Sequence, residues 1–257
     1  IVVSLLIAAF GQSAWVPGLA VLSGAFGFAL FWKGMLVFSR PVDRFFLAVI
    51  WFSLVQGVHL SWLATTDYMG PLIIGLYLFL ILAMGIQFGL LSLFVNESIC
   101  WLRVLAIAGC WVIFEWVRLF FLCGFTWNPV GLALAASPYS LQFASVWGIF
   151  GLSFWVVLVN LGALKAWMAR SSRQLFIWGA MAAFPYIFGF VHQSWVEAHT
   201  KAGTTLDVAI VQTHLSPEQK EYSMQSPDAY IHPLIQWEQI LHALPKKKID
   251  LIVLPEA

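Results

Sequence analysis

The sequence predicts a polytopic α-helical membrane bundle followed by the start of an α/β domain, which is truncated by the end of the chain. Three observations support this: an apolar composition, an alternation of basic and uncharged connections, and a change of pattern near residue 195. Of the 257 residues, 61% are hydrophobic and 10% are charged, against about 45–50% and about 25% in an ordinary soluble protein. Most of the chain is therefore expected to lie in lipid.

A transmembrane helical domain is expected over residues 1–194. A helix needs about 20 mainly apolar residues to cross the hydrocarbon core of a bilayer. About seven candidate spans are found, at residues 1–14, 18–36, 44–64, 72–95, 101–121, 141–164 and 175–193. The first is short because the chain begins inside it, with Ile1 rather than Met. The sequence is therefore expected to be a fragment at its start as well as at its end.

The lysine and arginine residues indicate the orientation of these spans. They occur in every second connection, at Lys33, Arg40 and Arg44, then Arg103, then Lys165, Arg170 and Arg173. The connections at 11–17, 65–71 and 122–140 contain none. Because cytoplasmic loops are enriched in Lys and Arg, the basic connections are assigned to the cytoplasm. After seven crossings the chain is expected to emerge on the opposite side.

Residues 195–257 have the pattern of an α/β domain. A short apolar run within 205–215 is typical of a strand, apolar residues recur at helical spacing over 234–244, and "LIVLPE" ends the chain as a second strand. This order predicts a βαβ unit with a parallel sheet. Chemistry in such sheets lies at the carboxyl ends of strands, where Glu256 is found. By spacing alone, Glu256 fits a solvated cap and a general base equally well.

Glu115 and Arg118 are ionisable residues inside a predicted span. They are three residues apart, so they share one face of a helix. A charge at the bilayer centre costs about 2.5–3.5 kcal/mol even on the most lenient scale, so it is kept where it is paired or faces a cavity. Two interpretations stay open: a neutralised pair that locks helix packing, and a polar lining beneath a substrate cleft.

The stretch "CGFTWNPVG" (123–131) leaves the membrane without a charge. On pattern alone, Trp127 is better explained as one of the tryptophans found at any membrane interface than as part of a site. His59 has no second ligand at metal spacing, which favours a hydrogen-bonded role in the bundle. The cysteines fall in apolar stretches and indicate neither a disulfide framework nor a metal site; they are Cys100, Cys110 and Cys123.

Four stretches of the chain together resemble the apolipoprotein N-acyltransferase family. They are "GVHLSWL" (57–63), "WLRVLAIAGCWVIFEWVR" (101–118), "GFTW" (124–127) and "LQFASVWGIFGLSFWVVLVN" (141–160). The α/β segment, opening on "VAIVQ" and continuing to "LIVLPE", is also similar to that family. The resemblance implies a bacterial inner-membrane protein whose residues 195–257 form the N-terminal βαβ part of a periplasmic nitrilase-like domain.

The resemblance also implies an acyltransferase with two lipid substrates. In this family a cysteine thiolate takes an acyl chain from a phospholipid donor, and the amino group of a diacylglyceryl-lipoprotein acceptor then attacks the thioester. Glu256 matches the family's general base. The expected substrate-binding residues are Trp127 and Gly124 of "GFTW", with Glu115 and Arg118 beneath them. No cofactor, metal or nucleic acid is expected.

The lysine and the nucleophilic cysteine of this family lie downstream of the glutamate. Residues 1–257 alone are therefore expected to have no acyltransferase activity, and N-acylated lipoprotein formed by this chain alone would contradict that. Two alternatives remain. One is a membrane-anchored nitrilase-type amidase acting on a small soluble substrate, for which Glu115, Arg118 and Trp127 would be dispensable. The other is a non-catalytic transport or structural membrane protein, which would carry inverted repeats.

Overall fold

The computed structural model forms two compact units, Ile1–His199 and Thr200–Ala257. It describes residues 1–12, 15–66, 70–120, 124–125, 127–200, 203, 205–212, 215–220, 227–245 and 248–254. The first unit is helical and the second contains a small sheet. The predicted fold class, a polytopic helical bundle followed by the start of an α/β domain, is confirmed. Each unit is considered by itself.

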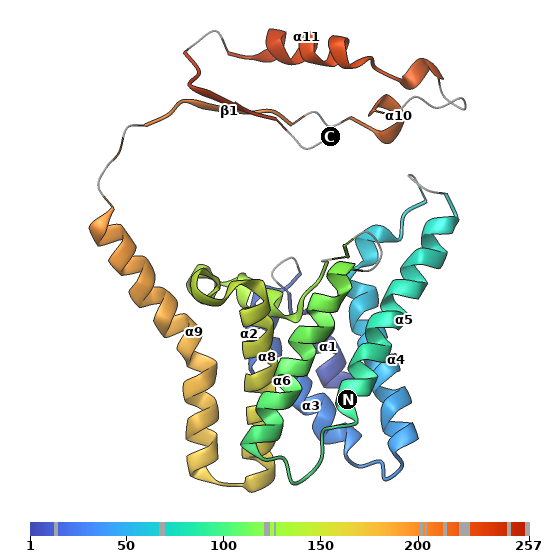
Figure 1. The fold of residues 1–257 in the computed structure, drawn as a ribbon, viewed down its shortest axis with the longest axis vertical. Coiled ribbons are helices and arrows are strands. Elements are labelled where there is room, and N and C mark those ends of the chain that lie inside the picture. The colour runs from blue at the N-terminus through green and yellow to red at the C-terminus, as the bar shows by residue number, and fades with distance from the viewer. Residues whose placement is uncertain are drawn as a thin grey trace. The chain divides into compact units, whose positions relative to one another are not determined.

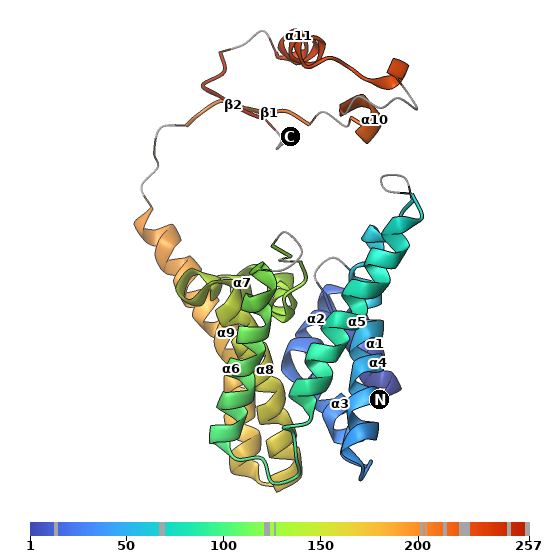
Figure 2. The ribbon, with the colours of Figure 1, turned by 45° about the vertical axis from the view of Figure 1, so that its right-hand side comes forward.

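The helical unit consists of long helices that run alongside one another and reverse direction at each connection (Figure 1). The main α-helices are α1 (Val2–Phe10), α2 (Pro17–Leu22), α3 (Phe28–Met35), α4 (Pro41–His59), α5 (Leu72–Ser92), α6 (Trp101–Val117), α8 (Ala144–Ala169) and α9 (Ser172–His199). Shorter elements are η1 (Ser23–Gly27), η2 (Ser61–Leu63), η3 (Arg118–Phe120), η4 (Val130–Ala136) and α7 (Pro138–Leu141). Helix α4 packs against α5, α6 packs against α8, and α8 packs against α9, as the turned view also shows (Figure 2).

Among the described residues, five helices are long and apolar enough to cross a membrane. They are 17–35, which joins α2, η1 and α3, together with α4, α5, α8 and α9. These five correspond to five of the predicted spans. The helices α1 and α6, of 9 and 17 residues, correspond to the other two but are shorter. The chain is a multi-pass membrane protein.

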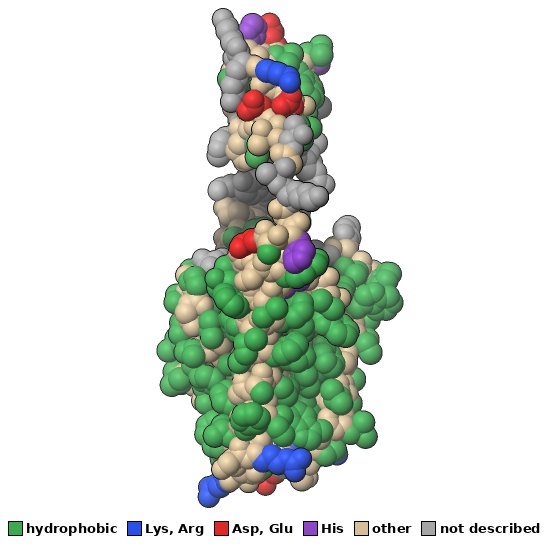
Figure 3. Space-filling view, turned by 90° about the vertical axis from the view of Figure 1, so that its left-hand side faces the viewer, with side chains coloured by type: hydrophobic (Ala, Val, Ile, Leu, Met, Phe, Trp, Pro, Cys, Tyr) green, Lys and Arg blue, Asp and Glu red, His purple; other side chains and the backbone are tan. Residues whose placement is uncertain are grey.

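The connections fall at two ends of the helical unit. The basic end contains the connections 36–40, 93–100 and 170–171, and the opposite end contains 11–16, 60–71 and 118–143. Lysine and arginine side chains gather at the basic end, beyond a continuous apolar face (Figure 3). The helix α9 continues to His199, past residue 194, and carries the chain away from the basic end (Figure 1).

Buried aromatic rings form the centre of the helical unit. Phe31 stacks on Trp51 with ring centroids 4.4 Å apart, and Phe52 stacks on Phe88 at 4.6 Å. The contact of α4 with α5 depends on glycine, because a Cβ on Gly85 would lie 2.7 Å from the carbonyl oxygen of Val49. Gly85 and Gly89 are four residues apart on α5, and this small-residue pair permits close helix approach.

The second predicted span contains a π-helical segment, η1, between α2 and α3. A π turn interrupts the regular i→i−4 hydrogen-bond ladder, and the fully buried Asn160 of α8 binds the backbone there. Its Oδ1 accepts from the N–H groups of Phe28 and Ala29 at 2.9 and 3.2 Å. Its Nδ2 donates to the carbonyl oxygens of Ser23 and Gly24 at 3.1 and 2.8 Å. One carboxamide therefore ties α8 to the irregular part of this span.

The second unit contains the predicted βαβ arrangement. The strands β1 (Val208–Ile210) and β2 (Leu251–Val253) pair in parallel, with Val208 opposite Leu251. The helix α11 (Pro233–Ala243) lies between them in sequence, with Pro233 in its first turn. The short elements α10 (Pro217–Lys220) and η5 (Pro227–Ala229) precede α11. A parallel pair needs such a crossover connection.

Candidate functional site

A loop at the opposite end of the helical unit carries the most exposed of the predicted site residues. We call residues 124–125 and 127–131 the Trp127 loop. Gly124 has φ +85° and Asn128 has φ +63°, so Trp127 lies between two left-handed residues. Glycine adopts this conformation without strain, and asparagine is one of the few other residues that tolerate it. The backbone of the loop is thus sharply bent on both sides of Trp127.

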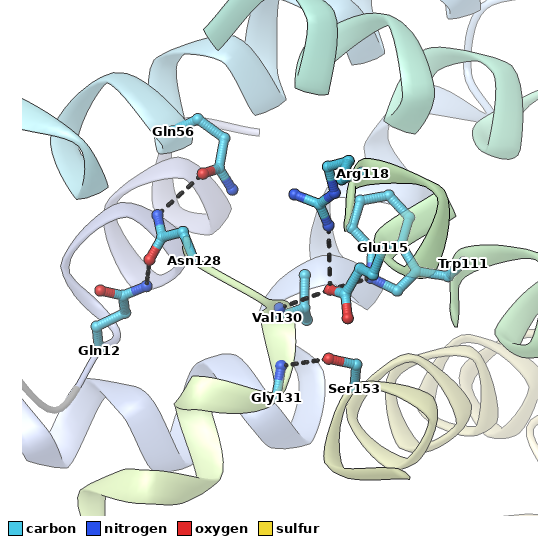
Figure 4. A network of polar contacts seen from close by, with 9 residues as sticks. All are labelled: Gln12, Gln56, Trp111, Glu115, Arg118, Asn128, Val130, Gly131 and Ser153. Carbon is cyan, nitrogen blue, oxygen red and sulfur yellow. Dashed lines mark hydrogen bonds and ion pairs between the residues drawn. The ribbon is translucent and has the colours of Figure 1, made fainter. Parts of the chain in front are cut away.

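Glu115 holds the C-terminal side of this loop from below (Figure 4). Its Oε1 accepts a hydrogen bond from the backbone N–H of Val130 at 2.8 Å and another from Nε1–H of Trp111 at 2.8 Å. The same oxygen lies 3.5 Å from the guanidinium of Arg118 in η3. The side chain of Glu115 is only 2% exposed. A buried charge requires pairing and hydrogen bonds of this kind, so Glu115 both neutralises Arg118 and fixes the loop.

Asn128 holds the N-terminal side of the loop through two glutamines. Its Nδ2 donates to Oε1 of Gln56 in α4 at 2.9 Å, and its Oδ1 accepts from Nε2 of Gln12 at 2.5 Å. Nε2 of Gln12 also lies 3.1 Å from Nδ1 of His59, whose Nε2 lies 3.0 Å from the carbonyl oxygen of Ala8. This pattern assigns the His59 proton to Nε2, because Nδ1 must accept from the amide. His59 is thus a hydrogen-bonded residue of the bundle.

A third anchor comes from α8, where the buried Ser153 accepts from the backbone N–H of Gly131 at 2.9 Å. The loop is therefore held by side chains from four parts of the bundle: the α1–α2 connection, α4, α6 and α8. Trp127 itself is 57% exposed. Its ring lies 5.0 Å from the ring of Trp62 in η2, which is 55% exposed. Trp127 of the anchored loop and Trp62 of η2 thus form an exposed aromatic platform.

An apolar groove lies near this platform, between α1, α4 and α5. It has a volume of about 690 Å³ and includes Ile50, Leu54, Tyr77 and Ile81 in its walls. Ser61, which directly precedes Trp62, also lines it. The volume is within the range of about 300–1,000 Å³ that small-molecule sites occupy. The walls from α4 and α5 belong to helices that are long and apolar enough to cross a membrane.

The predicted site residues are brought together only in part. Glu115 and Arg118 form an ion pair, and Val130 connects Glu115 to the loop that contains Gly124 and Trp127. The helix-locking interpretation of Glu115 matches these contacts, and its position beneath the Trp127 loop matches the other interpretation. Glu256, the predicted general base, lies outside the described residues. So does Cys123.

Sequence reasoning missed several residues of this region. Gln12, Gln56 and Ser153 are polar residues in apolar stretches. Because polar residues inside membrane spans are uncommon and often functional, Gln56 and Ser153 could have been singled out from the sequence. Trp62 lies within "GVHLSWL", one of the stretches that carry the family resemblance, and was not singled out. Asn128 could not be singled out from the sequence, because only its left-handed backbone conformation distinguishes it from an ordinary loop residue.

Comparisons with known proteins agree with the resemblance. A family model described as the apolipoprotein N-acyltransferase N-terminal domain matches residues 2–162. The chain is 26% identical over 266 positions to an apolipoprotein N-acyltransferase of Chlamydia pneumoniae, covering 99% of this chain and 48% of that protein. It is 34% identical over 200 positions to the one from Chlamydia muridarum, covering 74% and 36% respectively.

A more distant relative gives the same result. The chain is 28% identical over 274 positions to an apolipoprotein N-acyltransferase of Caulobacter vibrioides, covering 98% of this chain and 48% of that protein. The chain thus spans about half the length, or less, of these curated relatives. Because the family model covers most of the helical unit and well over half of the chain, this protein belongs to the apolipoprotein N-acyltransferase family.

Proposed function

We propose that the whole protein transfers an acyl chain from a phospholipid to the N-terminal diacylglyceryl-cysteine of lipoproteins. The observation that carries this proposal is the Trp127 loop, an exposed tryptophan on a loop fixed by buried side chains in a protein of this family. A rigid aromatic residue at the membrane interface suits a substrate whose acyl chains stay in the bilayer while its ester lies at the surface. The relatives carry the name of this activity.

The proposal places the protein in the bacterial inner membrane with its basic end toward the cytoplasm. The asymmetry of Lys and Arg supports this orientation. At 1.5 Å per residue, α9 is about 42 Å long and starts at the basic end, so it delivers residue 200 to the other side. The second unit is then periplasmic and is the N-terminal βαβ part of a nitrilase-like domain. Glu256, which follows the second strand in the sequence, is the proposed general base.

The groove between α1, α4 and α5 is the proposed binding site for an acyl chain of one lipid substrate. Keeping such a chain in an apolar groove avoids the cost of moving it into water, about 0.8 kcal/mol per CH₂ group. The platform of Trp62 and Trp127 then contacts the polar part of the lipid at the mouth. Glu115 and Arg118 serve this site as positioning residues, because they hold the loop rather than the lipid.

The thiolate that the reaction needs is not supplied by the cysteines of the described helices. Cys100 is the N-cap of α6 at the basic end, which is the opposite end of the bundle from the Trp127 loop. Cys110 lies on the exposed surface of the middle of α6, where an apolar environment would disfavour its thiolate. The proposed nucleophile therefore belongs to the nitrilase-like domain, where the resemblance places it.

The proposal is tested by expressing the whole protein in cells depleted of their own N-acyltransferase. Mass spectrometry of a lipoprotein N-terminus should show the added acyl chain. Trp127→Ala should slow the transfer at least about tenfold, which is about 1.4 kcal/mol of transition-state stabilisation. Trp195→Ala is the matched control, because Trp195 is similarly exposed, at 59%, and stacks on His199 at 4.7 Å.

Two results would contradict the proposal. A well-expressed protein that leaves the lipoprotein N-terminus unacylated would exclude the activity itself. Transfer that is equally fast in Trp127→Ala and Trp195→Ala would exclude the Trp127 loop as a lipid contact. An amidase with a membrane anchor predicts hydrolysis of a small soluble amide that is indifferent to both substitutions.

A further inference from the structure

A second groove lies at the basic end of the helical unit, far from the Trp127 loop. It has a volume of about 450 Å³ and runs between the 17–35 span, α8 and α9. Small side chains create the space, namely Ala29 of α3 and Ala163 and Ala166 of α8. Trp178 of α9 lines it too, and its Nε1–H donates to the carbonyl oxygen of Ala25 at 3.1 Å. The walls are thus apolar and are held in place across three helices.

The mouth of this groove carries a cation. Arg170, Ser171 and Ser172 line it at the connection between α8 and α9. Arg170 is exposed, and none of the ion pairs within the described residues involves it. It ends α8 in a left-handed conformation with φ +45°, which is uncommon for a residue other than glycine. The backbone thus turns sharply at the point where the guanidinium meets the groove.

The position of the groove determines what can fill it. Its walls belong to α8 and α9, two of the helices that are long and apolar enough to cross a membrane. A groove open to the hydrocarbon region is filled by lipid chains, because water has no place there. Arg170, Ser171 and Ser172 at its mouth belong to one of the connections at the basic end, where lysine and arginine side chains gather (Figure 3). Basic residues at such a surface attract anionic lipid headgroups. Apolar walls beneath an unpaired cation match one lipid molecule with a negatively charged headgroup.

We propose that this groove binds an anionic phospholipid of the leaflet at the basic end. An acyl chain lies along Ala163 and Ala166, and the phosphate lies on Arg170 with the hydroxyl groups of Ser171 and Ser172 beside it. Such a lipid sits at the other end of the bundle from the Trp127 loop, so it is not a substrate of the proposed reaction. It fills the space between the 17–35 span and α9, and thereby stabilises the packing of α9.

Lipid retention in native mass spectrometry tests this proposal. The whole protein is released from nanodiscs that contain equal amounts of phosphatidylglycerol and phosphatidylcholine, and the bound lipid is identified. We expect retained phosphatidylglycerol in preference to phosphatidylcholine. Arg170→Gln should reduce that preference about fivefold, the effect of one basic residue on an anionic lipid. Arg170→Lys should preserve the preference within about twofold, because it keeps the charge.

Two further variants separate this groove from the general basic surface. Arg173→Gln removes an exposed charge in the first turn of α9 that does not line the groove, and it should leave lipid retention unchanged. Ala166→Phe fills the groove and should abolish the preference for phosphatidylglycerol over phosphatidylcholine. Equal effects of Arg170→Gln and Arg173→Gln would overturn the proposal in favour of diffuse attraction. Equal retention of phosphatidylcholine by the wild-type protein would overturn it as well.

Discussion

The same arrangement of a carboxylate, a backbone N–H group and a cation occurs in both units. In the helical unit, Glu115 accepts from the N–H of Val130 at 2.8 Å and lies 3.5 Å from Arg118. In the α/β unit, Asp250 accepts from the N–H of Asp207 at 3.0 Å and lies 3.1 Å from Lys248. The two constellations have similar distances. Their surroundings differ, and this difference decides what each contributes.

The Glu115 cluster is buried and the Asp250 cluster is open to solvent. The side chains of Glu115 and Arg118 are 2% and 11% exposed, whereas those of Asp250 and Lys248 are 25% and 86% exposed. An exposed ion pair is screened and contributes little, while removal of one partner from a buried pair leaves an uncompensated charge. Similar geometry therefore supports a rigid functional loop in one unit and a weak strand-end contact in the other.

The largest expected effect is that of Glu115→Ala. It should lower the free energy of unfolding by about 3–5 kcal/mol, because Arg118 loses its carboxylate in a buried place. Glu115→Gln should cost about 1–2 kcal/mol, since its amide oxygen still accepts from Val130 and Trp111. Thermal unfolding in nanodiscs measures both. If Glu115→Ala unfolds at the wild-type temperature, the contrast between the two units does not hold.

Replacing a buried neutral side chain should also lower the free energy of unfolding, which would show that burial matters as well as charge. Asn160→Leu removes five hydrogen bonds from a fully buried carboxamide. At about 0.6 kcal/mol for each hydrogen bond in a membrane protein, the loss is about 3 kcal/mol. Asn96→Leu is the matched control, because Oδ1 of Asn96 is buried without a partner among the described residues. Equal unfolding temperatures for the two variants would refute this account of η1.

The smallest expected effect belongs to Asp250 and depends on pH. The backbone N–H of Asp207, and then Lys248, lower the pKa of the Asp250 carboxyl below its ordinary value. A lowered pKa means that the carboxylate stabilises the fold above the unfolded value, about 3.9, and that this contribution is lost as the pH falls through the folded pKa. Asp250→Asn should remove this part of the acid sensitivity.

Hydrogen exchange of the peptides that contain β1 and β2 measures this effect, after correction for the intrinsic pH dependence of exchange. In the wild-type protein, protection should begin to fall as the pH approaches the unfolded Asp value of about 3.9, and it should go on falling through the lower folded pKa. The variant should show a smaller fall. Identical pH profiles for the two proteins would show that Asp250 adds nothing to the strand pair.

The fold was largely predictable because its signals are local. The predicted spans 44–64 and 72–95 correspond to α4 and α5, since composition alone separates lipid-embedded helices from their connections. The βαβ order of the second unit followed from the apolar runs at its two strands. The π segment η1 was not predicted. It depends on Asn160, which is 132 residues from Phe28 in the chain, and no local pattern reports such a contact.

The candidate site was less predictable for the same reason. Glu115 and Arg118 were found because their spacing places them on one helix face. Their link to Trp127 runs through the backbone N–H of Val130, which leaves no trace in the side-chain sequence. The contact of Trp62 with Trp127 likewise joins two distant segments. A stretch quoted for a family resemblance can identify such residues, but it does not reveal which of them meet.

The central claim is that Glu115 acts on acyl transfer by holding the loop that presents Trp127. A double-mutant cycle in the whole protein tests this most directly, with the rate of lipoprotein N-acylation per folded protein measured for Glu115→Ala, Trp127→Ala and the double variant. The account predicts that each single variant slows transfer and that the double variant is no slower than Trp127→Ala, because loss of the carboxylate acts on transfer through the position of Trp127. Effects that multiply, or a folded Glu115→Ala protein as fast as the wild type, would contradict it.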